Sequence, residues 1–320
     1  MKCKLLLLGS IPPPAGGVTI HVQRLIAFLT NEHYSFTFCH VRKSSFYRIL
    51  CEIHKHNFVH IHISNIYVCF ILCLYCKLVC KKLIMTRHGS IDRHTGLIKF
   101  FDFASIYLAY LPIVLNDASY KLAKKYNHAV IKVSPFIPPA TDSVLPDYIL
   151  QTLSSAKQKY KYVFSACASD LTFTSQHLET YGVTELISVF CSFPEYFLII
   201  TTRSPNYYNY LLQNKTHIPD NIFIVQEPVD FFTVVKNTDV MIRHTMTDGD
   251  SLAVREAIYL QKPVIASDCV SRPPGTITYH TLEDLRMILA SFNLSQIPSN
   301  IHEDKANNAH TLLQIYRSLE

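Results

Sequence analysis

The residues best placed to do chemistry lie between positions 239 and 257. An apolar run at 239–243 predicts a strand that ends at Arg243, and a polar loop follows it. This loop carries Asp248, and Glu256 comes eight residues later in an expected helix. Both carboxylates can therefore face the loop end of a sheet, where Glu256 could accept hydrogen bonds from ribose hydroxyls.

Between these two carboxylates the sequence predicts a helix start that could bind an anion. Ser251 is a suitable N-cap, and the backbone amides of Leu252 and Ala253 could hold a diphosphate at the positive end of the helix dipole. A surface loop whose acidic residues complement the same dipole is the alternative. The spacing alone favours that alternative.

A second candidate site lies between the first expected strand and the first expected helix. The connecting loop ends in the paired glycines Gly16 and Gly17, which allow a backbone to approach a ligand closely. Amides at the start of a helix also attract anions. The loop lacks the G-x-G-x-x-G spacing, so we do not expect a dinucleotide site. A tight strand-to-helix turn explains the glycines equally well.

Short apolar runs alternate with helical patterns along the whole chain. This alternation predicts α/β folding, with parallel sheets covered by helices on both faces. The first series places strands at 4–8, 36–41, 59–64, 82–87, 113–116 and 130–133, with helices at 19–31, 46–54, 67–81, 98–109 and 118–126. The second series places strands at 162–166, 196–201, 222–225, 240–243 and 263–267, with helices at 178–192, 207–214, 229–236, 251–260, 282–290 and 303–318.

A proline-rich segment at 134–139 separates the two series, because proline cannot continue a helix. We therefore expect an N-terminal Rossmann-like domain at 1–140, a linker at 141–161, a C-terminal Rossmann-like domain at 162–300 and a C-terminal helix at 301–320. The chain has 320 residues, of which 49% are hydrophobic and 17% charged, which suits two packed cores.

Charge is unevenly distributed between these halves. Residues 1–142 hold 17 Lys and Arg against 6 Asp and Glu, whereas residues 143–320 hold 13 against 18. A basic first half can meet anionic lipid or a phosphorylated substrate, although a merely solvated basic surface is equally compatible. The aromatic residues do not interleave with basic clusters, so we expect no nucleic-acid partner.

Nothing at the start of the chain resembles a secretory signal, since the apolar run at 5–8 is only four leucines long. We therefore expect a cytoplasmic protein with reduced thiols. The apolar run at 66–80 is too short to span a bilayer and contains Lys77. A buried helix is expected there, and a helix at the membrane interface is the alternative.

Cysteines and histidines raise the question of a metal site. The spacing of Cys69, Cys73 and Cys76 would suit an iron–sulfur cluster, but these residues lie inside an apolar helical pattern and are expected as buried thiols. His60 and His62 alternate on one side of a strand, without a Cys or carboxylate to complete a zinc ligand set. We therefore expect core or cleft histidines and no metal site.

Longer motifs resemble family 4 retaining glycosyltransferases, which have the two-domain GT-B fold with facing Rossmann-like domains and the active site in the cleft between them. The segment 247–257, TDGDSLAVREA, is similar to the family's E-x7-E motif, and 261–268, QKPVIASD, is similar to its GKPVIASD. The segment 13–22, PPAGGVTIHV, resembles the family's opening loop, and Thr86 to Gly89 resembles its HG motif. Here Asp248 stands for the family's first Glu and Gln261 for its Gly.

The resemblance implies roles for these residues. Gly16 and Gly17 would line the donor diphosphate or an acceptor phosphate, and His88 would lie near the sugar. Asp248 would contact the hydroxyls of the transferred sugar. The phosphates would meet Ser251, Leu252 and Ala253, and the ribose would meet Glu256. Such enzymes usually need no metal and no tightly bound cofactor, and they use a nucleotide-diphosphate sugar as donor.

One departure from the family concerns the positive charge at the diphosphate. Many relatives place Arg and Lys after the first strand of the second domain. Residues 164–171 here, FSACASDL, contain neither Lys nor Arg. Without metal, some cation must balance the leaving group. Arg243 is our main candidate because it ends a strand of an open α/β sheet, where ligands bind. Arg255 and Arg203 are further candidates.

The sequence therefore predicts a retaining glycosyltransferase that acts on a saccharide or lipid-linked saccharide. Its setting would be surface polysaccharide biosynthesis, such as O-antigen or capsule, at the inner face of the plasma membrane. A GT-B relative that epimerises or hydrolyses a sugar nucleotide is one alternative. A non-catalytic subunit that binds a nucleotide sugar is another. Donor sugar, nucleotide, acceptor, linkage and oligomeric state are not predicted.

Overall fold

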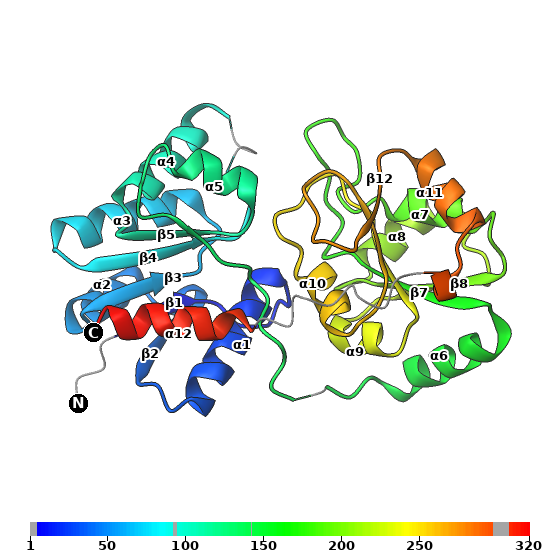
Figure 1. Ribbon diagram of the computed structural model, residues 1–320, viewed down its shortest axis with the longest axis horizontal. Coiled ribbons are helices and arrows are strands. Elements are labelled where there is room, and N and C mark those ends of the chain that lie inside the picture. The colour runs from blue at the N-terminus through cyan, green and yellow to red at the C-terminus, as the bar shows by residue number, and fades with distance from the viewer. Residues whose placement is uncertain (1–4, 92–94, 142, 297–306) are drawn as a thin grey trace. The chain divides into compact units, whose positions relative to one another are not determined.

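A computed structural model describes residues 5–91, 95–141, 143–296 and 307–320. The chain forms two compact units (Figure 1). Unit 1 comprises residues 1–140 together with 307–320, and unit 2 comprises residues 141–306. The chain therefore leaves unit 1 once and returns to it at its end.

Unit 1 is built on a six-stranded parallel sheet with the order β2-β1-β3-β4-β5-β6. Its strands are β1 (Leu5–Gly9), β2 (Phe36–His40), β3 (Phe58–Ile61), β4 (Lys82–Arg87), β5 (Leu111–Val114) and β6 (Ile131–Lys132). Its helices are α1 (Gly17–Asn31), α2 (Phe46–Lys55), α3 (Ile66–Leu78), α4 (Gly96–Leu108), α5 (Asp117–Ala123) and α12 (Asn308–Ser318), with a 3-10 turn η1 (Val41–Lys43).

Unit 2 contains a second six-stranded parallel sheet, ordered β12-β11-β10-β7-β8-β9. Its strands are β7 (Tyr162–Cys167), β8 (Tyr196–Thr201), β9 (Ile222–Val225), β10 (Val240–Arg243), β11 (Val264–Ser267) and β12 (Ile277–Tyr279). Its helices are α6 (Asp147–Lys159), α7 (Val183–Phe190), α8 (Asn206–Gln213), α9 (Phe231–Lys236), α10 (Leu252–Tyr259) and α11 (Leu282–Ala290), with a 3-10 turn η2 (Leu294–Gln296).

The predicted α/β architecture of parallel sheets alternating with helices is confirmed. The central strands are apolar along their whole length, as in LLLLG at Leu5–Gly9 and YFLIIT at Tyr196–Thr201, because helices cover both faces of the sheet. Several helices begin at a side chain that caps a backbone amide. These N-caps are Ser45, Asn65, Asn116, Asp230, Ser251, Thr281 and Asn307.

Three segments differ from the elements expected from the sequence. Residues 147–159, placed in the expected linker, form helix α6, whose Ile149 and Leu153 pack into the core of unit 2. Strand β12 was not expected, since it is only three residues long. Helix α7 begins at Val183 rather than at 178, because Phe173 and Glu179 form an antiparallel bridge before it.

The C-terminal helix α12 lies on unit 1, beside α1 (Figure 1). Ala309, Leu312 and Leu313 pack against Leu5 and Leu25 in a shared apolar cluster. Tyr316 is fully buried in the same cluster, and its hydroxyl lies 2.6 Å from Nδ1 of His60 on β3. The last helix of the chain therefore completes the core of its first unit.

Helix α3 is only half buried, although its sequence predicted a buried helix. Cys69, Leu72 and Cys76 face the core, whereas Ile71 and Leu78 are 47% and 73% exposed. The helix is apolar on all sides, so its periodicity could not indicate which face is covered. Among the helices that the structure describes, none is long and apolar enough to cross a membrane.

The contact between α12 and β3 gives a test of this arrangement. Replacing Tyr316 with Phe leaves the ring packing in place but removes the partner of a buried histidine nitrogen. We expect this change to lower the free energy of unfolding by about 1–3 kcal/mol, measured by urea denaturation. Tyr34→Phe is the matched control, because the hydroxyl of Tyr34 donates to Glu320 at an exposed position and its loss should cost less than about 0.5 kcal/mol. Equal effects of the two variants would contradict the buried contact.

Candidate functional site

The first candidate site lies at the carboxyl edge of the sheet in unit 2. Strands β7 and β10 are neighbours there, although they are far apart in sequence, and the strand order reverses between them. Open α/β sheets bind ligands at such a switch point. Arg243, the last residue of β10, lies at this point and donates through Nη1 to the carbonyl oxygen of Cys167 at the end of β7 (3.3 Å).

Two guanidinium groups converge on one carboxylate at this edge. Arg243 binds both oxygens of Asp248, with distances of 3.0 Å from Nε to Oδ2 and 3.2 Å from Nη2 to Oδ1. Arg272 donates from Nη1 to Oδ2 of the same residue at 2.9 Å and from Nε to the carbonyl of Ser267 at 2.8 Å. The three side chains are each at most 10% exposed. This cluster of Arg243, Asp248 and Arg272 is called the arginine clamp below.

The arginine clamp keeps Asp248 and Arg243 charged. Burial by itself would raise the pKa of Asp248, but the guanidinium of Arg243, and then that of Arg272, hold this pKa below its ordinary value. Burial disfavours the charged form of Arg243, yet the carboxylate of Asp248 holds the pKa of that guanidinium above its ordinary value. Because two cations share one anion, an incoming anion could be bound here by exchanging with Asp248.

Helix α10 starts beside the loop that carries Asp248. Ser251 caps it, its hydroxyl accepting from the amide of Val254 at 3.4 Å. Within the described part of the chain, the amides of Leu252 and Ala253 have no acceptor, as is usual in a first turn. Glu256, further along α10, is buried at 3% exposure. The helix start can therefore donate to an anion, and Glu256 can accept a hydrogen bond.

A buried histidine stabilises the end of β10. His244 lies between the carboxylate of Glu185 and the hydroxyl of Tyr279, at 2.6 Å from each. Its ring leaves no room beside Gly182, whose φ of 47° is in the left-handed region and whose Cβ, if present, would overlap His244. These contacts hold the loop before α7 against the end of the sheet.

The second candidate site lies at the carboxyl edge of the sheet in unit 1, where the strand order reverses between β1 and β3. Gly16 is the N-cap of α1 and Gly17 its first residue. The hydroxyl of Thr19 donates to the carbonyls of Pro14 and Gly16, at 2.9 and 3.1 Å, and so closes the loop. A Cβ on Gly17 would meet no atom within 4 Å. Packing within the protein therefore does not require glycine there, although a closely approaching ligand would.

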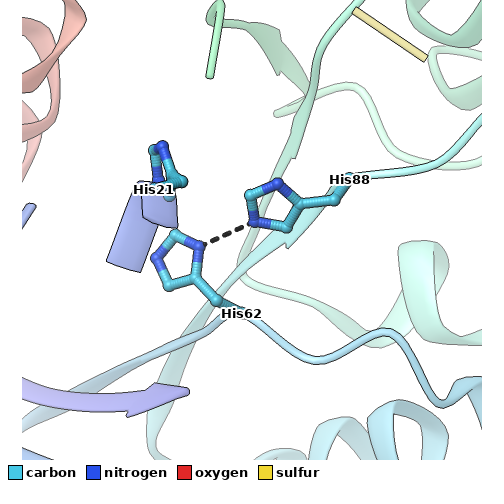
Figure 2. Close-up of side chains that lie close together, drawn as sticks. All are labelled: His21, His62 and His88. Carbon is cyan, nitrogen blue, oxygen red and sulfur yellow. Dashed lines mark hydrogen bonds between the residues drawn. The ribbon is translucent and has the colours of Figure 1, made fainter. Parts of the chain in front are cut away.

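Three histidines gather at this second edge (Figure 2). His21 comes from α1, His62 follows β3 and His88 follows β4. Nδ1 of His62 lies 3.0 Å from Nε2 of His88, and the ring centroid of His21 lies 4.9 and 5.1 Å from those of His62 and His88. Strand alternation predicted that His60 and His62 share a side, and their rings are 4.1 Å apart.

Burial keeps these histidines neutral. It lowers the pKa of His21 to about 4 and that of His60 to about 3, and it places the pKa values of His62 and His88 well below their ordinary range. Mutual repulsion between the rings acts in the same direction. The neighbouring Arg87 forms an ion pair with Asp102, with 2.8 Å between Nε and Oδ1, and both side chains are buried.

The structure thus gathers the residues singled out from the sequence into two groups. Arg243 and Asp248 meet in unit 2, near the start of α10 with Ser251, Leu252, Ala253 and Glu256. Gly16, Gly17 and His88 belong to unit 1. Arg255, a further candidate, pairs with Asp250 at 2.9 Å. Sequence reasoning missed Arg272, and the only available signal was its place in the loop that follows the predicted strand at 263–267.

Comparisons with known proteins bear on the fold. No family model and no curated protein matches the sequence. Solved structures that share its fold include HepE from Anabaena in complex with UDP-glucose (TM-score 0.68, 12% identity, 98% of each chain). They also include WaaG, a glycosyltransferase involved in lipopolysaccharide biosynthesis (0.63, 12%, 97% of this chain and 95% of that one), and a Listeria monocytogenes protein provisionally assigned as a UDP-N-acetylglucosamine 2-epimerase (0.64, 14%, 99% and 96%).

Together with the two parallel sheets, this likeness over the full chain defines a protein of the GT-B fold class, with two Rossmann-like units. The fold class expected from the sequence motifs is therefore confirmed. At 12–14% identity the likeness establishes the fold alone.

The buried histidines predict a steep loss of stability in acid. Their pKa values are lower in the folded state than in the unfolded chain, so the unfolded chain binds more protons once the pH falls below about 6.5. The free energy of unfolding should be nearly constant above pH 7. It should then fall with decreasing pH by up to about 1.4 kcal/mol per pH unit for each of the four histidines.

Urea denaturation between pH 7.5 and 5, in a metal-chelating buffer, measures this slope. The matched control is His128→Asn at an exposed position, which should leave the slope unchanged. A stability that does not change between pH 7 and 5 would contradict neutral burial of the cluster.

Proposed function

We propose that this protein is a glycosyltransferase that transfers a sugar from a UDP-sugar to a saccharide or lipid-linked saccharide. The observation that carries the proposal is the arginine clamp at the switch point of unit 2, beside the N-terminus of α10. The UDP-glucose complex of HepE, a protein of the same fold, supports a uridine nucleotide as the donor.

The clamp is suited to a diphosphate that leaves without help from a metal. Phosphate oxygens would take over guanidinium contacts of Arg243 and Arg272, and the amides of Leu252 and Ala253 would donate to the same groups. This exchange would free the carboxylate of Asp248 to accept hydrogen bonds from the transferred sugar. Glu256, in the same helix, would accept from the ribose.

The reaction proposed is a retaining transfer without a protein nucleophile. The bond between the anomeric carbon of the sugar and the β-phosphate oxygen breaks, and a bond forms between that carbon and an acceptor hydroxyl oxygen on the same face. The proton of the hydroxyl passes to the leaving diphosphate. Buried cations stabilise the charge that develops on this leaving group, which is the main catalytic requirement.

Unit 1 is assigned to the acceptor in this proposal. Gly16 and Gly17 would let its backbone approach a phosphate or saccharide, as the open space beside Gly17 permits. His88 is neutral, so its ring would accept or donate a hydrogen bond to a sugar hydroxyl without adding charge. The proposed transfer step uses no tightly bound cofactor.

An epimerase is the second candidate, because the Listeria protein assigned to that activity has the same fold. An epimerase would convert the UDP-sugar without any acceptor, whereas a transferase would leave it intact until an acceptor is added. A subunit that only binds the donor would do neither. Incubation of the protein with UDP-sugars alone, analysed by chromatography, separates these functions.

The donor site is tested by nucleotide binding. In a thermal-shift panel of UDP, GDP, CDP and ADP and their sugars, we expect UDP compounds to stabilise the fold, by about 2.7 kcal/mol at a hundred times Kd. Arg272→Gln removes a charged donor and should weaken UDP binding about 10–100-fold. Glu256→Gln should weaken it as well.

Arg286→Gln is the matched control, because Arg286 lies in the same unit but forms only a surface pair with Glu283. It should bind UDP as the unmodified protein does. The donor site would be refuted if no nucleotide shifted the transition, or if Arg272→Gln, shown to be folded by circular dichroism, bound UDP with unchanged affinity.

Unit 1 has an exposed apolar face, which supports a role for the protein at a membrane surface. On α3 the exposed residues follow helical spacing, and α4 packs beside α3 (Figure 1). These residues are Tyr67, Ile71, Leu74 and Leu78 on α3, and Leu97, Ile98, Phe100 and Tyr107 on α4. Lys77 and Lys99 lie on the same helices and are exposed. Apolar side chains flanked by lysines favour the interface of an anionic bilayer.

We therefore propose peripheral docking of this face on the cytoplasmic side of the membrane, and vesicle co-sedimentation tests it. Binding to phosphatidylglycerol vesicles should exceed binding to phosphatidylcholine vesicles and should weaken as salt increases. The double variant Ile71→Glu, Leu78→Glu should weaken binding at least about tenfold.

Met287→Glu on α11 is the control, since it also adds a charge at an exposed apolar residue, but in unit 2. It should bind vesicles normally. Failure of the unmodified protein to bind anionic vesicles at low salt would rule out membrane docking through this face.

A further inference from the structure

The three histidines at the edge of unit 1 are arranged as metal ligands. His21, His62 and His88 each offer one ring nitrogen, and these nitrogens all lie within 4.8 Å of one another. Figure 2 shows the rings of His62 and His88 joined by a hydrogen bond, with the ring of His21 close to both. Three imidazoles bound to one zinc ion at 2.0–2.1 Å would bring their nitrogens to about 3.3 Å from each other. Side-chain rotation would close most of the difference.

The hydrogen bonds of His21 leave its other nitrogen available. Nδ1 lies 2.7 Å from the carbonyl oxygen of Pro135, and a carbonyl can only accept, so Nδ1 carries the proton. The lone pair of His21 is therefore on Nε2, which is buried and has no partner among the described residues. A backbone carbonyl that orients the far nitrogen is the usual support of a histidine that binds a metal.

His62 has a similar open nitrogen. Its Nε2 is buried without a partner in the described part of the chain, and its Nδ1 contacts only the neighbouring His88. His62 is 2% exposed and His21 is likewise 2% exposed. Buried polar atoms are normally satisfied, so an open ring nitrogen on each of two neighbouring histidines points to a ligand.

The adjacent His60 shows that burial alone does not produce this arrangement. It is fully buried in the same row, but Nδ1 contacts the hydroxyl of Tyr316 at 2.6 Å and Nε2 contacts that of Thr86 at 2.8 Å. Both nitrogens of His60 are therefore used within the protein. In this group of four rings the open nitrogens belong to His21 and His62, which lie at the edge of the sheet.

The electrostatic surroundings permit a cation to bind. The three imidazoles are neutral at physiological pH, because burial lowers their pKa values, so a metal need not displace protons. The closest bases are engaged elsewhere: Arg87 pairs with Asp102, and Arg24 donates to the carbonyl of Ile137 at 3.1 Å. His88 is only partly buried, which leaves a route from solvent.

We propose that His21, His62 and His88 form a three-histidine site for zinc or a similar divalent transition metal. The ion would take the open Nε2 of His21 and one ring nitrogen from each of His62 and His88. Three protein ligands leave a fourth position for water or another oxygen ligand. The site goes beyond the proposed transfer reaction, whose diphosphate is assigned to unit 2 and needs no metal.

Competition with a chromogenic chelator tests the site with Zn²⁺ alone. The metal-stripped protein should bind one equivalent of Zn²⁺ at pH 7.5. His21→Gln and His88→Ala should each weaken that binding at least about tenfold. The control His128→Ala, at an exposed position, should bind as the unmodified protein does. Retention of full affinity in either cluster variant would overturn the proposal.

Co²⁺ provides a measurement that does not depend on any variant folding. Bound to three histidines and an oxygen, it should give visible absorption of the intensity typical of four-coordinate sites, and Zn²⁺ should displace it. A six-coordinate spectrum, or no uptake, would also overturn the proposal. UDP binding is measured separately, so a failure here and a failure of the donor site can be distinguished.

Discussion

Each unit depends on a parallel sheet that is buried on both faces, and this constraint decides where polar side chains can gather. Helices cover the faces, so the strands are apolar along their length, as in the four leucines that begin β1. The charged residues of these strands, such as Arg87 and Arg243, lie at strand ends. Parallel strands all end at the same edge, so residues far apart in sequence meet there.

In unit 2 this edge places cations where burial would otherwise exclude them. A buried guanidinium is tolerated only when it is paired, and Asp248 pairs with both Arg243 and Arg272. The shared carboxylate makes the cluster stable without a ligand and leaves it able to exchange partners with an anion. The same contact thus serves stability and, in the proposed reaction, binding of the leaving group.

In unit 1 the corresponding edge gathers neutral rings beside the buried ion pair of Arg87 and Asp102. Burial lowers the pKa values of the histidines, so they bring hydrogen-bonding and ligating nitrogens to the edge without a net charge. The difference between His60, whose nitrogens are both used, and His21, whose Nε2 is open, shows two uses of the same residue type in one cluster. His60 helps to hold α12 against the core, and His21 lies beside His62 and His88.

The sequence by itself determined the alternation of strands and helices, the two sheets, the strand end at which Arg243 lies, and the loop and helix that carry Asp248 and Glu256. Periodicity and apolar runs are local properties, which is why they could be predicted. Motif resemblance added the GT-B fold. Only the tertiary structure decided which loops meet. Arg272 reaches Asp248 from another loop, and the histidines of unit 1 come from three separate elements, so no local spacing could predict either cluster. Helix α6 was missed because the sequence of its segment is polar, and its core contacts exist only once unit 2 has folded.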